Sequence, residues 1–319
     1  MRVLVLGGTG FIGSWVTRSL AEAGSEVAVF HRGKTQQALP DGVREVLGDR
    51  KAFDDSRDAL LGFRPDVVVD IALYTEGAAQ AVVDLFRGHA ARLVVLSSVD
   101  VYRNYDGLRR LSAAPPDPAP LTEDSPLRDR LFPYRAEADG PDDFRYHYEK
   151  ILVERLVLGV PDLSGTVLRL PRVYGPGDRQ HRFWQYLSAI DGGAAEIPMP
   201  RGAAAWRWTS AYVEDVGAAV ALAARDDRAA GKIYNVAEAN TMPEAERVAH
   251  IGSLCDWPGT VRVTDSPDDT PDWPDLDWSY HLETSSELLR EQLGYRKPVS
   301  RDEGLLRTIA WERANPPAA

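Results

Sequence analysis

Three glycines near the N-terminus constrain the fold of this chain more than any other feature. Gly7, Gly10 and Gly13 form a GxxGxxG pattern directly after an apolar run at residues 3–6 and at the start of a helical pattern over about 11–23. A buried strand, a glycine turn and a helix in this order are typical of a dinucleotide-binding βα unit, whose helix N-terminus receives the pyrophosphate. We expect Gly7 to allow the turn, Gly10 to admit the pyrophosphate, and Gly13 to let helix and strand pack closely.

Short apolar runs continue to alternate with helical patterns along the first half of the chain. The further expected strands are at 26–30, 67–69, 93–97 and 167–170. Strands separated by helices of ten to fifteen residues are typical of βαβ units and a parallel sheet. The predicted fold class is therefore α/β, a doubly wound parallel Rossmann sheet with a smaller C-terminal α/β substrate lobe.

The regular pattern predicts two lobes. Residues 1–168 form the expected NAD(P)-binding domain, in which the irregular segment 103–145 is an insert and a candidate lid. Residues 169–319 form mainly the substrate lobe, with 211–237 returning to the first domain. The stretch from 266 to 278, rich in Asp, Pro and Trp, is expected to be a surface loop.

Charge and cysteine content exclude several classes of partner. The net charge of -11 argues against nucleic acid, because phosphate binding needs a cationic surface. The one cysteine, Cys255, excludes an intrachain disulfide and a cysteine-based metal site, and no metal is expected. No apolar run is long enough for a signal peptide or a membrane span, so we expect a cytoplasmic protein without membrane contact.

The end of the second strand favours NADP over NAD. An NAD site usually presents Asp or Glu there to the ribose 2′-OH, whereas this chain reads Val-Phe-His-Arg-Gly at 29–33. Arg32 is placed to pair with a 2′-phosphate, although it also fits a solvated surface position. Asp49 follows the third strand and is placed to reach the adenine, although a plain loop aspartate needs no such role.

A tyrosine and a lysine four residues apart form the candidate proton-transfer pair. Tyr146 and Lys150 begin an expected helix that runs through Leu158, so both side chains point to one site. The ammonium favours the tyrosinate, and Lys150 also reaches the nicotinamide ribose. Tyr148 is the alternative, but it is expected on a different helix face.

Polar side chains at the end of a strand complete this candidate site. Ser98 and Asp100 are two residues apart, so their side chains lie on the same face of the sheet if the strand continues to Asp100. The carboxyl ends of strands carry active sites in open α/β sheets. Ser98 is predicted to bind the substrate oxygen that Tyr146 protonates.

Four segments, GGTGFIG, SSVDVY, YHYEK and RLPRVYGPGD, occur here in that order. With them the sequence resembles the extended short-chain dehydrogenase/reductases, the NAD-dependent epimerase/dehydratase family. The resemblance implies a Ser98/Tyr146/Lys150 triad, a homodimer and, in many members, nucleotide-sugar substrates. The predicted cofactor-binding residues are Gly7, Thr9, Gly10, Phe11, Ile12, Gly13, His31, Arg32, Asp49, Ala72 and Lys150.

The sequence also departs from the family pattern. Ser98 and Tyr146 are 48 residues apart, about twice the usual spacing. No asparagine lies between 72 and 98 to complete a tetrad, and Gln80 is a candidate substitute. Arg172 replaces the asparagine of RxxNxYGP, which weakens the expectation of a nucleotide sugar.

Basic and aromatic residues of the second half are candidates for substrate contacts. The predicted substrate-binding residues are Arg172, His181, Arg182 and Arg207. Trp206 and Trp208 flank Arg207 and are placed to stack on a ring. Arginines on a solvated surface and tryptophans in a core remain the alternative.

The leading hypothesis is an NADP-dependent oxidoreductase that moves a hydride to or from a carbinol or carbonyl carbon. Its substrate is expected to be small and polar, anionic or sugar-like. The second is an epimerase or dehydratase with retained NAD(P) acting on a (nucleotide) sugar. Asp100, where sugar dehydratases carry an acid, favours it slightly, but Val99 occupies the partner position. The third is a dinucleotide-sensing or RNA-associated protein without catalysis, of which the HRG segment at 31–33 is reminiscent.

Overall fold

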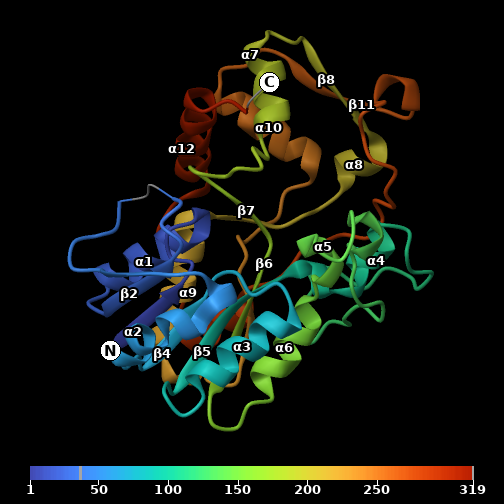
Figure 1. Ribbon diagram of the computed structural model, residues 1–319. Helices are drawn as coiled ribbons and strands as arrows, with labels where there is room; N and C mark the ends of the chain where they lie inside the picture. The colour runs from blue at the N-terminus through green and yellow to red at the C-terminus, as the bar shows by residue number, and fades with distance from the viewer. Residues whose placement is uncertain (36–37, 318–319) are drawn as a thin grey trace.

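The computed structural model describes residues 1–35 and 38–317. Within them, seven strands form one sheet in which each paired strand is parallel to its neighbour (Figure 1). In spatial order they are β10 (Ile233–Asn235), β6 (Ser164–Leu170), β5 (Arg92–Ser98), β4 (Val67–Asp70), β1 (Arg2–Leu6), β2 (Glu26–His31) and β3 (Arg44–Leu47). This order, with a reversal between β1 and β4, confirms the predicted doubly wound sheet.

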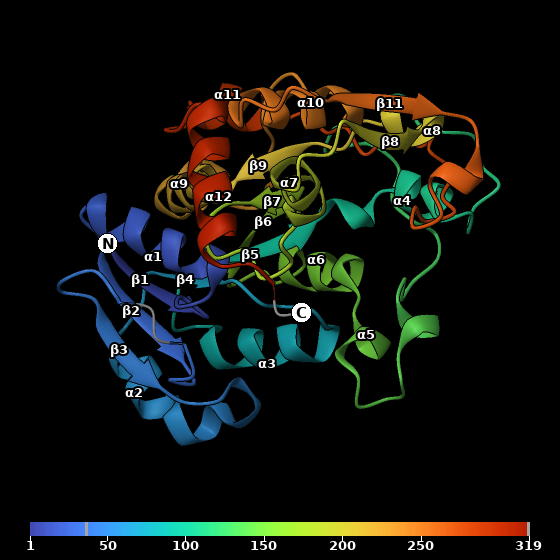
Figure 2. The same cartoon turned by 90° about the horizontal axis from the view of Figure 1, so that it is seen from above.

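Helices cover both faces of this sheet (Figure 2). One face carries α1 (Phe11–Glu22) and α9 (Val213–Arg225), which pack against each other; the other carries α2 (Arg57–Gly62), α3 (Glu76–Phe86) and α6 (Lys150–Leu158). Val3 and Val5 belong to the first core, whereas Leu4 and Leu6 belong to the second. Strands buried on both faces are apolar at every position, which explains the unbroken apolar runs of the sequence.

Apart from β10, α9 and α11 (Glu287–Leu293), which packs beside β10, most elements of the second half lie above the carboxyl ends of the sheet strands (Figure 1). They include two short parallel pairs, β7 (Arg172–Tyr174) with β9 (Ser210–Tyr212) and β8 (Glu196–Pro200) with β11 (Thr260–Thr264). The helices above the strand ends are α7 (Trp184–Asp191), α8 (Arg201–Ala205), α10 (Glu244–Leu254) and α12 (Arg301–Ala314). The division into two lobes remains our prediction, and its boundary at 168/169 falls inside β6.

The insert at 103–145 contains α4 (Arg103–Leu108), the short 3-10 helix η3 (Arg135–Glu137) and the start of α5 (Phe144–His147). The single helix expected from Tyr146 to Leu158 is wrong, because α5 ends at His147 and α6 begins at Lys150. Tyr148 and Glu149 between them have extended backbone. The Glu149 carboxylate accepts the N–H of Ile151 as the cap of α6, so the chain starts a new helix here.

Candidate functional site

A cavity of about 560 Å³ opens at the carboxyl ends of β1, β4 and β5. We call it the cofactor cavity. Its first wall is the glycine turn, where Gly7 has a φ of +92° and a Cβ on Gly13 would lie 2.2 Å from the Gly7 carbonyl oxygen. Only glycine at residue 13 allows this approach, and the free N–H groups of α1 face the same turn. A glycine-lined wall and a helix N-terminus fit the pyrophosphate of a dinucleotide.

Most of the predicted cofactor-binding residues line this cavity. Those that do so are Gly7, Gly10, Phe11, Ile12, Gly13, Ala72 and Lys150. The cavity also includes residues that the sequence did not single out for this role, among them Ile71, Tyr74, Asp178 and Arg179. Tyr74 and Ile71 follow β4, so the strand-end rule that found Ser98 could also have found them.

The remaining predicted cofactor residues lie outside the lining of the cavity. Thr9 is buried, and His31 lies 3.2 Å from Glu45. Arg32 is exposed. Asp49 is exposed and accepts the N–H of Lys51, which starts the 3-10 helix η1 (Arg50–Ser56).

Lys150 is a fully enclosed cation in the floor of the cavity. Its Nζ donates to the carbonyl oxygens of Leu73 at 2.6 Å and Leu96 at 2.8 Å. The ammonium also lies 4.7 Å from the Tyr74 ring centre and 5.9 Å from that of Tyr148. Burial lowers the pKa of Lys150 to about 8, against the opposing effect of Asp100. Lys150 is thus held in place by two carbonyls, one in the loop after β4 and one within β5.

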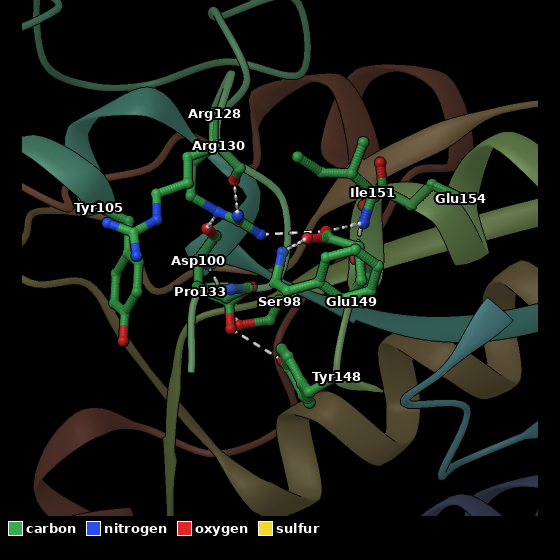
Figure 3. Close-up of polar contacts among 12 residues, drawn as sticks. Ser98, Asp100, Tyr105, Arg128, Arg130, Pro133, Tyr148, Glu149, Ile151 and Glu154 are labelled. Carbon is green, nitrogen blue, oxygen red and sulfur yellow. Dashed lines mark hydrogen bonds and ion pairs between the residues drawn. The ribbon is translucent and has the colours of Figure 1, made fainter. Parts of the chain in front are cut away.

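Tyr148, rather than Tyr146, lines the cavity with Lys150. Figure 3 shows Tyr148 beside Asp100 and Ser98. Its hydroxyl donates to Asp100 Oδ2 at 2.8 Å, and the side chain is buried. Burial and the Asp100 carboxylate raise the pKa of Tyr148, whereas a hydrogen bond with Ser98 lowers it. Ser98, Tyr148 and Lys150 therefore meet at one end of the cavity.

Tyr146 lies on the far side of the break between α5 and α6. Its ring is 4.8 Å from the Arg135 guanidinium, and its carbonyl accepts from Arg135 at 3.0 Å. The extended backbone at Tyr148 and Glu149 removes the shared helix face on which the pairing of Tyr146 with Lys150 depended. A catalytic role for Tyr146 remains a prediction that this geometry does not favour.

Ser98 and Asp100 are in contact through a turn, and not through the continued strand that was expected. β5 ends at Ser98, and the next three residues form the 3-10 helix η2 (Val99–Val101). The Ser98 hydroxyl accepts the N–H of Asp100 at 3.2 Å, so the strand does not persist. The turn places the Asp100 carboxylate under the Tyr148 hydroxyl. Gln80, the candidate tetrad residue, is exposed and donates to Asp84.

A second cavity of about 470 Å³ takes part of its lining from the insert. We call it the aromatic cavity, because Tyr105, Tyr186 and four tryptophans, Trp206, Trp208, Trp273 and Trp278, line it. Two of these tryptophans come from residues 266–278. This stretch is a mostly exposed loop, as predicted, but Trp273 and Trp278 are half-buried and line the cavity. The Trp278 ring packs on Trp206 at 5.2 Å between ring centres, and the Trp273 ring packs on Trp278 at 5.9 Å.

One predicted substrate residue, Arg172, lies in the wall of the aromatic cavity. Its guanidinium is 3.4 Å from Glu244 and 4.7 Å from the Trp208 ring centre. Burial lowers the pKa of Arg172 to about 9. An arginine stacked on an indole and paired with a carboxylate is a pre-oriented polar group in an apolar wall.

The other three predicted substrate residues do not gather around Arg172. Arg182 pairs with Asp178 at 2.6 Å and lines the cofactor cavity. His181 stacks on Trp311 and lies 2.6 Å from Glu312. Arg207 donates to the Thr241 carbonyl. Of the four, only Arg172 and Arg182 face a cavity described here.

The structure shows neither a metal-binding cluster nor a spanning helix in the part of the chain that it describes. Residues 1–35 and 38–317 bring no three His, Cys, Asp or Glu side chains together in a geometry that would hold a metal ion. Over the same residues, no helix combines the length and hydropathy needed to cross a membrane.

Comparison with known proteins gives the same assignment as the glycine turn and the strand-end residues. Residues 3–237 match the NAD dependent epimerase/dehydratase family. The chain belongs to this family. The predicted membership is thereby confirmed, and with it the class of NAD(P)-dependent reductases, epimerases and dehydratases.

Two relatives in this class are reductases. The 2′-dehydrokanamycin reductase of Streptomyces kanamyceticus is 31% identical over 78% of this chain, and the match spans 66% of its own length. The 3-diazoavenalumate denitrifying reductase of a Streptomyces species is 31% identical over 78% of this chain and 80% of its own.

A solved family structure shares the fold over almost the whole chain. The epimerase Mth375 of Methanothermobacter thermautotrophicus superimposes with a TM-score of 0.71 and 20% identity. The match covers 98% of this chain and 92% of that one.

Proposed function

We propose that this member of the epimerase/dehydratase family is an NADP-dependent oxidoreductase that reduces a carbonyl group to a carbinol. One observation carries the proposal: Ser98, Tyr148 and Lys150 line the same cavity as the glycine turn. A proton donor and a nucleotide site in one cavity suit hydride transfer coupled to proton transfer.

Each side chain has a step that follows from its position. The nicotinamide cofactor, when bound, supplies the hydride. The Ser98 hydroxyl orients the carbonyl oxygen, and the Tyr148 hydroxyl gives that oxygen its proton. Lys150 stabilises the tyrosinate that remains, because its ammonium is enclosed near the Tyr148 ring and close charges interact strongly there. Tyr148 thus takes the role that the sequence assigned to Tyr146.

Two cations beyond β2 support NADP as the cofactor. Arg32 and Lys34 follow the strand and are exposed. A guanidinium there pairs with a 2′-phosphate through its planar fork. We therefore assign the preference for NADP to Arg32.

The aromatic cavity supports a substrate that carries a ring and a polar or anionic group. Tryptophan faces bind rings or the apolar faces of sugars. The guanidinium of Arg172 only donates hydrogen bonds, so its partner on the substrate must be an acceptor group. The names of the two reductases, one acting on dehydrokanamycin and one on diazoavenalumate, agree with ring-containing substrates. We extend this substrate class to the present chain.

An epimerase or dehydratase acting on a nucleotide sugar is the second candidate. Asp100 favours it, because its carboxylate touches Tyr148 and is available as a further proton acceptor. Val99, at the position of a second acid, is buried and apolar. Solved structures of similar fold are described with UDP-glucuronic acid and NAD, but their identity of 22% supports the fold alone.

Binding and turnover measurements test the proposal together. Purified protein is titrated with NADPH and NADH by nicotinamide fluorescence and then assayed with ring-containing ketones. We expect more than about tenfold tighter NADPH binding, worth about 1.4 kcal/mol, and NADPH oxidation with some ketone. Tyr148→Phe should lower kcat by at least about 100-fold, whereas Tyr146→Phe should retain most of it. Equal NADH binding, or full activity of Tyr148→Phe, contradicts the proposal.

Cytoplasmic location and a homodimeric assembly without a nucleic-acid partner complete the proposal. The net charge of -11 supports the last part, since it opposes phosphate backbones. Sedimentation of the purified protein tests the dimer, and a monomer at micromolar concentration would contradict it.

A further inference from the structure

A chain of hydrogen bonds connects the cofactor cavity to the aromatic cavity. The Tyr148 hydroxyl donates to Asp100 Oδ2 at 2.8 Å, and the Tyr134 hydroxyl donates to the same oxygen at 3.0 Å. The Tyr105 hydroxyl in turn donates to the Tyr134 hydroxyl at 2.8 Å. Tyr148 lines the cofactor cavity and Tyr105 lines the aromatic cavity. Figure 3 shows them on either side of Asp100.

The members of this chain are held in place by their surroundings. Asp100 is 4% exposed, and its other carboxylate oxygen, Oδ1, has no hydrogen-bond partner. The Arg109 guanidinium lies 5.4 Å from the ring centre of Tyr134 and 5.6 Å from that of Tyr105. The rings of Tyr134 and Tyr148 pack edge to face at 5.0 Å. The hydroxyl groups therefore keep hydrogen-bond distance without bound substrate.

We propose that Tyr105, Tyr134 and Asp100 form a proton path that reprotonates Tyr148 after each turnover. The inference rests on the proposed function, in which Tyr148 gives its proton to the carbonyl oxygen. It assigns a task to the insert at 103–145, which supplies both Tyr105 and Tyr134.

In the reductive direction, the path replaces every proton that the reaction removes from a side chain. The hydride adds to the carbonyl carbon, the O–H bond of Tyr148 breaks, and its proton forms the new O–H bond of the alcohol. Asp100 Oδ2 gives a proton to the tyrosinate as it takes one from Tyr134. Tyr134 is reprotonated by Tyr105, and Tyr105 by water in the aromatic cavity. Each cycle consumes one hydride and one proton from water and returns every side chain to its starting state.

The geometry at Asp100 makes this transfer direct. Both tyrosines donate to the same oxygen, so a proton passes at one atom and the carboxylate does not need to rotate. A separate contact keeps the two sides of the path together. Glu149, next to Tyr148, pairs with Arg128 of the insert at 3.1 Å, and neither side chain is exposed. Glu149 also accepts the N–H of Phe132, two residues before Tyr134.

Tyr134→Phe tests the path, because it removes one hydroxyl and keeps the ring. The test compares the first turnover with steady-state turnover in stopped flow, with NADPH and a ketone that the enzyme reduces. Tyr148 starts each experiment protonated, so the first turnover should keep the wild-type rate. Later turnovers should slow by at least about tenfold, which gives a burst of one NADPH per site.

Tyr280→Phe is the matched control. Tyr280 packs in the cluster with Leu108, and its hydroxyl donates to the Ala114 carbonyl, outside the path. This variant should show neither a burst nor a slower steady state. A Tyr134→Phe protein without a burst, whether both phases match the wild type or fall together, overturns the path.

A measurement without substrate separates this inference from the proposed function. Protein labelled with carbon-13 at tyrosine Cζ reports the exchange of each hydroxyl proton with deuterium, and Tyr148→Phe assigns the signal of Tyr148. The path predicts that this exchange slows by at least about tenfold in both Tyr134→Phe and Tyr105→Phe. Unchanged exchange overturns the path. Slowed exchange in a protein that reduces no ketone instead rejects the proposed function and leaves the path in place.

Discussion

The cofactor cavity and the aromatic cavity are similar in volume but differ in how the chain builds them. The cofactor cavity takes its first wall from one short turn, Gly7 with residues 10–13, and its floor from the ends of neighbouring strands. The aromatic cavity collects side chains from segments as far apart as 105–109, 172, 206–208 and 272–282. Its shape therefore depends on how distant parts of the chain pack.

This difference explains which site carries a family signature and which carries specificity. The glycine turn is dictated by backbone geometry, which tolerates almost no change. The four tryptophans of the aromatic cavity lie outside the helices and strands, where substitution changes the cavity without changing the fold. We expect mutations in the two cavities to separate cofactor binding from substrate binding.

The largest effect is expected in the glycine turn. Gly13→Ala places a Cβ 2.2 Å from the Gly7 carbonyl oxygen and should weaken NADPH binding by more than about 100-fold, or about 3 kcal/mol. Gly77→Ala in α3, where a Cβ meets nothing within 4 Å, is the control. Fluorescence titration measures both, and wild-type affinity in Gly13→Ala would remove the glycine turn from the cofactor site.

A smaller effect confined to substrate is expected in the aromatic cavity. Trp273→Ala removes an indole from the wall and should raise KM for a ring-containing ketone about 10- to 100-fold, since it loses about 1.5–3 kcal/mol of contact. Its dissociation constant for NADPH should stay unchanged. Leu306→Ala, on the exposed side of α12, is the control. A parallel loss of NADPH affinity would show that the two cavities are not independent.

Cofactor choice should shift by about tenfold when the cation after β2 is removed. Arg32→Ser loses the pairing with a 2′-phosphate. It should weaken NADPH binding about tenfold and leave the affinity for NADH unchanged. Arg44→Ser is the control, because it removes the same charge from an exposed position on β3. Equal weakening by both variants would point to general electrostatic attraction.

The smallest effect is a pH dependence of stability that comes from Lys150. Because burial lowers its folded-state pKa to about 8, the unfolded chain binds more protons between pH 8 and the ordinary lysine value. Stability relative to Lys150→Met should therefore rise with pH over this window, by about 1–2 kcal/mol between pH 7.5 and 9.5. Urea unfolding at the two pH values measures it, and a flat or falling difference contradicts the lowered pKa.

The sequence predicted the parts of the site that depend on local backbone rules. The glycine turn, the strand ends and Lys150 follow from patterns of a few residues, and the structure places them together. Tyr146 was preferred over Tyr148 because a four-residue spacing was read on an unbroken helix. The break depends on Glu149, whose carboxylate meets Arg128 and Phe132 from 17 to 21 residues earlier. No local pattern contains that contact.

The aromatic cavity was missed for the same physical reason on a larger scale. Trp206 and Trp208 were noticed beside Arg207, but Trp273 and Trp278 sit in a stretch whose prolines and aspartates are typical of solvent-exposed loops. Trp278 packs on Trp206 and Trp273 packs on Trp278, which places both side chains in the cavity wall. Only the tertiary structure brings the two segments into contact.

The buried pair of Arg128 and Glu149 has a consequence for attempts to change substrate range by loop grafting. Replacing the insert with that of a relative that has no arginine at this place would leave the Glu149 charge buried without a partner, at about 3–5 kcal/mol. The graft would then loosen the segment that carries Tyr148 even if every new loop residue suited the new substrate. A transferable unit in this protein is therefore the insert together with residue 149, and chimaeras should exchange both ends of the pair at once.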